Sequence, residues 1–69
     1  MSYFDYRVCL DVTARDYPFY SLIMAAMMRA DTRNIELLKQ AFPATWAELD
    51  ARYHAPGGRL DGERTSEAE

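Results

Sequence analysis

Asp50 and His54 are the two side chains in this sequence whose types and spacing could support acid–base chemistry. Residues four apart lie on one face of a helix, and a carboxylate placed there could orient an imidazole for proton transfer. Such catalysis also needs a nucleophile or a set of metal ligands beside the pair, and the neighbouring sequence supplies neither. We therefore interpret the two residues as a solvated surface pair, or as His54 interacting with a helix C-terminus.

Metal and phosphate chemistry have equally little support. Cys9 and His54 are the only cysteine and histidine among 69 residues, whereas zinc sites need three or four closely spaced ligands. Cys9 has no partner for an intramolecular disulfide, and we interpret it as a small buried hydrophobe. The Gly57-Gly58 pair follows a predicted helix instead of preceding one, unlike a phosphate-binding loop. We predict that the protein is not an enzyme and binds no metal or cofactor.

The apolar run over residues 17–30 predicts the helix around which the chain is organised. Asp16 is expected to cap this helix, with Pro18 in its first turn. The run is too short for a membrane span, which needs about 20 residues. Its side chains fall on two apolar faces at about 100° per residue. One face holds Phe19, Leu22, Ile23, Ala26 and Ala30, and the other holds Tyr17, Tyr20, Met24, Met27 and Met28. Such a helix needs cover on both faces, from its own chain, a second copy or a partner.

Two shorter helices are predicted after this one. Asp31 or Thr32 can cap the first, which runs to about Phe42 with an apolar stripe on one side. Pro43 ends it and also serves as an early residue of the next helix, predicted over 44–54. In that last helix, three side chains at i, i+3 and i+7 form a stripe expected to pack inward. These are Trp46, Leu49 and Tyr53.

The stretch Tyr6–Thr13 alternates apolar and polar residues, which predicts a half-buried strand. A lone strand needs a partner, and three arrangements remain open: pairing with its own copy, pairing with the sheet edge of another protein, or lying as an extended arm over the methionine face. A short helix is the alternative if the alternation is accidental. The predicted fold class is mainly α, a small three-helix domain over 16–58, with 1–15 as an N-terminal arm or strand and 59–69 as a flexible acidic tail.

The net charge of −3 is concentrated in the predicted tail. Residues 1–58 hold seven acidic and six basic side chains, so the predicted domain is nearly neutral. Nucleic-acid-binding domains usually carry clustered Lys and Arg, and we therefore expect no direct nucleic-acid contact. With no signal-peptide pattern at the N-terminus, we expect a cytoplasmic protein.

The segment DYPFYSLIMAAMMRADTRNIELLKQAFPATWAELDARYHAPGG, residues 16–58, resembles short uncharacterised proteins of bacterial phages and other mobile elements. The similarity lies in the DYPFY start, the MRADT turn, the AFP break and the ARYHAPGG end, and the segment is 43 of the 69 residues. The resemblance transfers no catalytic residues. It implies a setting in which small proteins bind host machinery, and anti-CRISPR proteins are similar in size and in their lack of catalytic motifs.

The resemblance and the two-faced helix together predict a non-enzymatic inhibitor that binds a host defence complex, of the type that occludes a CRISPR effector in the cytoplasm of the host bacterial cell. Methionine side chains suit such binding because they repack easily, and carboxylates can mimic phosphate charge. The candidate partner contacts are Tyr20, Met24, Met27, Met28, Asp31, Glu36, Glu48 and Asp50. The alternative is a homodimeric accessory or structural protein of a mobile element, without inhibitory activity, in which the same apolar residues pair with themselves.

Overall fold

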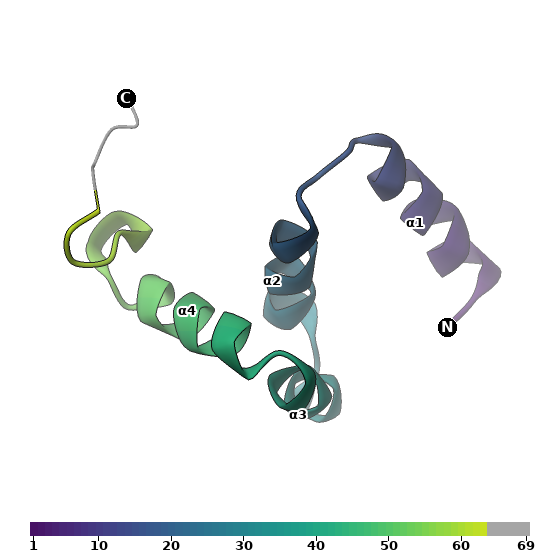
Figure 1. Ribbon diagram of the computed structural model, residues 1–69. Coiled ribbons are helices and arrows are strands. Elements are labelled where there is room, and N and C mark those ends of the chain that lie inside the picture. The colour runs from purple at the N-terminus through teal and green to yellow at the C-terminus, as the bar shows by residue number, and fades with distance from the viewer. Residues whose placement is uncertain (64–69) are drawn as a thin grey trace.

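Four α-helices and one short 3-10 turn make up the fold in the computed structural model, which describes residues 1–63 (Figure 1). The helices are α1 (Tyr3–Ala14), α2 (Phe19–Arg29), α3 (Thr32–Ala41) and α4 (Pro43–Tyr53), and the turn η1 is Pro56–Gly58. No β-strand occurs within residues 1–63. The prediction of a small, mainly helical domain is therefore confirmed, with one more helix than expected.

Helix α1 occupies the segment in which a strand was expected, so the strand prediction over Tyr6–Thr13 is wrong. A capping box begins the helix. Ser2 Oγ accepts a hydrogen bond from the Asp5 N–H at 3.1 Å, and the Asp5 carboxylate accepts one from the Ser2 N–H at 3.0 Å. A lone strand would leave its backbone groups without partners, whereas a helix pairs them internally. Cys9, which was expected to be buried, is exposed on this helix.

The starts of α2, α3 and α4 follow local signals in the chain. As predicted, Asp31 caps α3, because its carboxylate accepts a backbone N–H from three residues ahead at 2.8 Å. Pro43 is the first residue of α4, also as predicted. Helix α2 differs, since it begins at Phe19 after an extended Pro18 and has no side-chain cap. Asp16 does not cap α2 but adopts a φ of 55° in the turn after α1, a left-handed conformation that aspartate tolerates.

Met27 of α2 is the only buried side chain among residues 1–63, with 4% of its surface exposed. Helix α4 packs against α2, α3 and η1, and α2 also contacts α3. Three helices of ten or eleven residues are too few to enclose one of them on all sides. The packed part therefore has a small centre and a large exposed apolar surface.

Helix α1 lies apart from the other three helices. No Cα atom of α1 comes within 8 Å of a Cα atom in another described element, and Figure 1 shows α1 standing off from α2 beyond the linker. Its aromatic side chains stay exposed, with Tyr3 and Phe4 each at 73%. Only α2, α3, α4 and η1 therefore form the packed body.

Arg52 of α4 holds the chain that follows η1. Its guanidinium donates two hydrogen bonds to the Glu63 carboxylate, at 2.8 and 2.7 Å. It donates two more, to the Glu48 carboxylate at 2.9 Å and to the Gly58 carbonyl oxygen at 2.8 Å. Such a bidentate arginine–carboxylate pair fixes both partners in one geometry. Four hydrogen bonds from one side chain therefore join α4 to the segment that ends at residue 63.

This arrangement changes what was expected of the C-terminal segment. Residues 59–63 were assigned to a flexible tail, but the pair between Arg52 and Glu63 holds them against α4. The rest of the predicted tail, 64–69, lies outside the described residues. The hydrogen bonds from Arg52, and then the N–H of Leu60, lower the pKa of Glu63 from 4.5 to about 2, because both favour the charged carboxylate.

We predict that Met27→Ala destabilises the protein by roughly 2 kcal/mol or more, because truncating a buried methionine removes packing and leaves a cavity. Urea unfolding followed by circular dichroism measures the change. The matched control is Met28→Ala, which truncates an exposed neighbour and should change the free energy of unfolding by less than about 0.5 kcal/mol. Equal effects of the two substitutions would contradict the assignment of Met27 as the packing centre.

We predict that the pair between Arg52 and Glu63 makes stability depend on acid pH. The folded-state pKa of Glu63 is depressed to about 2, so its contribution is fully present above the ordinary value of 4.5 and is lost as the pH falls towards 2. Glu63→Gln should flatten the melting temperature against pH in this window. Asp61→Asn, which removes a carboxylate from the same turn, should keep the wild-type slope. A wild-type slope in Glu63→Gln would show that the pair does not contribute.

Candidate functional site

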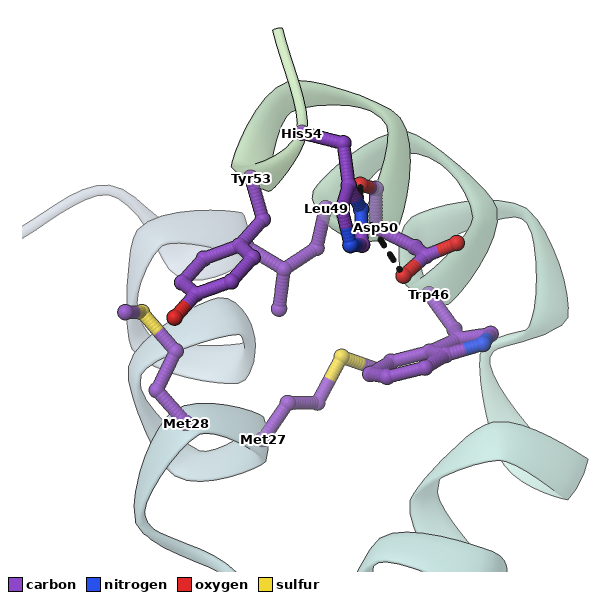
Figure 2. Close-up of a pocket in the computed structure, with 7 residues that line it drawn as sticks. All are labelled: Met27, Met28, Trp46, Leu49, Asp50, Tyr53 and His54. Atoms are coloured by element: carbon purple, nitrogen blue, oxygen red, sulfur yellow. Dashed lines mark hydrogen bonds and ion pairs between the residues drawn. The ribbon is translucent and has the colours of Figure 1, made fainter. Parts of the chain in front are cut away.

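An apolar groove lies between α2 and α4. Its volume is about 420 Å³. Two side chains from α2 and four from α4, with the residue that follows α4, line it: Met27, Met28, Trp46, Leu49, Asp50, Tyr53 and His54. Figure 2 shows the methionines projecting from α2 towards α4, with Met27 directed at Trp46. We call this site the α2–α4 groove.

The walls of the groove combine adaptable and rigid apolar groups. Met28 is 66% exposed and Tyr53 is 74% exposed, while Met27, which is directed at Trp46, is buried. Methionine fills irregular contacts readily, and aromatic side chains offer large contact areas with few rotatable bonds. Lys39, which does not line the groove, makes a cation–π contact with Trp46, and its Nζ lies 4.9 Å from the centre of the indole ring. The groove is therefore open and apolar, and one of its aromatic side chains also contacts α3.

Asp50 and His54 form the polar rim of the groove. His54 Nδ1 lies 2.8 Å from the Asp50 carbonyl oxygen and 3.5 Å from its carboxylate oxygen (Figure 2). The two side chains are 53% and 70% exposed. This matches the interpretation of a solvated pair at a helix C-terminus, because His54 is the cap residue of α4. The pair places a carboxylate at the edge of an apolar surface.

A second hollow of about 400 Å³ also lies between α2 and α4. Its lining residues are Tyr20, Met24, Ala44, Thr45 and Glu48. The apolar candidates from the sequence therefore divide between two sites, with Tyr20 and Met24 in this hollow and Met27 and Met28 in the α2–α4 groove. Glu48 lines the hollow and is already paired with Arg52 at 2.9 Å. Both α2 and α4 therefore supply candidates to each site, with Asp50 of α4 in the groove and Glu48 in the second hollow.

The remaining carboxylate candidates do not gather with the others. Asp31 caps α3, and Glu36 of α3 pairs with Lys39 at 3.4 Å. Neither lines the α2–α4 groove or the second hollow, whereas Asp50 does line the groove. The four predicted acidic contacts therefore lie at separate places on the body, and the structure does not bring them together as one acidic face.

Sequence reasoning missed part of the groove because it assigned those side chains to the interior. Trp46, Leu49 and Tyr53 were expected to pack inward as one stripe, and Trp46 and Leu49 are indeed half-buried. For Tyr53 the expectation is wrong, since its side chain stands open at the groove. The i, i+3, i+7 spacing correctly grouped the three residues on one face. It could not show that α2 covers only part of that face.

Two general features of the described residues bear on the type of site. Within residues 1–63, no group of three or more His, Cys, Asp and Glu side chains is placed to hold a metal ion. None of the helices in this part of the chain has the length and apolar character needed to cross a membrane.

Comparison with known proteins gives no relative from which a function could be transferred. No protein-family model matches this chain, and no curated protein and no solved structure matches it. A functional assignment therefore depends on the α2–α4 groove and its surroundings.

Proposed function

We propose that this protein acts by binding, without catalysis, and that the α2–α4 groove holds an apolar segment of another protein. The observation that carries the proposal is the exposure of Met28 of α2 and Tyr53 of α4 in a concave apolar groove whose lining includes the buried Met27. A groove of about 420 Å³ is within the range of roughly 300–1,000 Å³ that is typical of ligand-binding clefts. Large exposed apolar side chains around a hollow are typical of interaction sites.

The occupant that best fits the groove is an amphipathic helix with basic residues beside its apolar face. Helices of this kind bind in apolar grooves through side chains spaced at i, i+3, i+4 and i+7. The Asp50 carboxylate is half-exposed at the rim, where it can meet a Lys or Arg of the partner.

The narrower form of the proposal is that this binding inhibits a host defence complex by occluding a CRISPR effector. Its support is the resemblance of residues 16–58 to small proteins of phages and mobile elements. Tyr20 and Met24 in the second hollow extend the proposed contact surface along α2. Inhibition by occlusion needs only a stable stoichiometric contact, which an open apolar groove can supply.

We predict that a model helix of leucine and lysine binds the α2–α4 groove more tightly than a matched helix of leucine and glutamate. Titration followed by the fluorescence of Trp46, the only tryptophan, measures both affinities. The difference should be about two- to fivefold, because an ion pair with the half-exposed Asp50 carboxylate contributes about 0.2–1 kcal/mol. Asp50→Asn should reduce the preference. Equal affinities, or tighter binding of the glutamate helix, would contradict the proposed chemistry of the partner.

We predict that the protein restores plasmid uptake in bacteria whose CRISPR system targets that plasmid. Transformation efficiency measures the effect, with a plasmid lacking the target as reference. Met28→Glu should abolish the protection because it places a charge at the apolar groove. The matched control is Ala25→Glu, which adds the same charge to an exposed residue of α2 outside the groove.

Three results would count against the proposal. Protection that survives Met28→Glu would remove the groove from the mechanism. Loss of protection in Ala25→Glu as well would indicate a general effect of charge on α2. If CRISPR interference with the plasmid is unchanged by the wild-type protein in strains that represent each type of CRISPR effector, the narrower proposal is overturned. The proposal of helix binding is tested separately by the titration of the two model helices.

A further inference from the structure

His54 is held at the rim of the α2–α4 groove by contacts on two sides. Its ring lies 5.4 Å from the ring of Tyr53 in a T-shaped arrangement. Its Nδ1 atom lies 2.8 Å from the Asp50 carbonyl oxygen and 3.5 Å from the Asp50 carboxylate (Figure 2). Asp50 is the only carboxylate among the described residues that line the groove. The imidazole is therefore placed beside the group that gives the rim its negative charge.

The contact with the Asp50 carbonyl oxygen determines which nitrogen of His54 takes up a further proton. A carbonyl oxygen only accepts hydrogen bonds, so Nδ1 carries the hydrogen of the neutral ring and Nε2 is left to accept a proton. Histidine is the side chain that ordinarily changes charge between about pH 5 and 8. Because the proton is added at Nε2, His54 can become positively charged while its Nδ1 contact with Asp50 is kept.

The elements packed around the groove bring no second group of this kind among the described residues. Helix α2 contributes only its two methionines to the lining, and η1 consists of one proline and two glycines. Helix α3 brings Lys39, which contacts Trp46 at 4.9 Å. Lysine, tyrosine and carboxylate side chains ordinarily keep their charge state between about pH 5.5 and 8. As the pH falls through this range, the charge at the rim therefore changes from a lone Asp50 carboxylate to a neutral pair of Asp50 with His54.

The ion pair that holds residues 59–63 does not change in the same range. The pKa of Glu63 is lowered to about 2 by the hydrogen bonds from Arg52 and then from the N–H of Leu60, so this carboxylate stays charged. A difference in binding between the two ends of the range therefore reports a change at the groove and not a loss of the segment that follows η1.

We propose that protonation of His54 switches the charge preference of the α2–α4 groove. A helix with basic residues is favoured at about pH 8 and loses this advantage at about pH 5.5. At the higher pH, the Asp50 carboxylate is available to a Lys or Arg of the bound helix. At the lower pH, the imidazolium 3.5 Å away neutralises that carboxylate and repels the same cation. This switch rests on the proposed function, because it regulates binding at the same groove.

Titration of the intact chain with the model helix of leucine and lysine, at about pH 8 and about pH 5.5, tests the switch. Trp46 fluorescence gives the affinity. The affinity should fall about two- to fivefold at the lower pH, which is the effect expected of one exposed ion pair. The affinity for the matched helix of leucine and glutamate should not fall. Raising the salt concentration to about 1 M, where the Debye length is about 3 Å, should remove the difference between the two pH values.

Two substitutions separate the charge of His54 from the rest of the site. His54→Gln stays neutral, so it should bind the lysine helix at both pH values as the wild type does at the higher one. His54→Lys stays positively charged, so it should bind at both pH values as the wild type does at the lower one. Both replace a side chain that is 70% exposed, and neither should change thermal unfolding.

The binding measurements distinguish a failure of the switch from a failure of the proposed function. If the lysine helix binds with the same affinity at both pH values, the switch is overturned and the groove remains a binding site. A pH dependence that persists unchanged in His54→Gln also overturns the switch, because the titrating group then lies elsewhere. If the lysine helix binds at neither pH, the proposed function fails and the switch fails with it.

Discussion

The small amount of chain around α2 limits what the molecule can bury. Helices α3 and α4 have only ten and eleven residues, and among residues 1–63 only Met27 is shielded from solvent. The apolar surface of α2 therefore cannot be covered by α3 and α4 alone. A chain of 69 residues has too little material to surround a helix that is apolar on both faces. The exposed methionines and aromatic side chains follow directly from this limit.

Because so little apolar surface is buried, local polar interactions are important in fixing the conformation of the chain. Ser2 with Asp5, and Asp31 with the start of α3, fix two helix beginnings, each worth about 1 kcal/mol in typical proteins. Arg52 joins α4 to the segment beyond η1 through its hydrogen bonds to Glu48, Gly58 and Glu63. These contacts define where the helices begin and where the chain turns back, but they do not bury apolar surface.

Two uncovered surfaces result. The α2–α4 groove is concave and apolar, with a carboxylate at its rim, and it is the basis of the proposed binding of an apolar helix. Helix α1 does not contact the body that forms the groove, so its exposed aromatic side chains form a separate surface.

The sequence by itself determined the features that depend on neighbouring residues. It placed the helices of residues 17–54 because their starts are marked by Asp31 and Pro43 and their apolar spacing is helical. It erred on residues 6–13, where alternation suggested a strand, because the capping residues that precede the stretch were not weighed. The tertiary structure alone decided which apolar side chains are covered. Met27 and Met28 share a predicted face, yet one is buried and the other is exposed, and Tyr53 is open although Trp46 is half-buried. Burial depends on where α4 meets α2, and no local pattern contains that information.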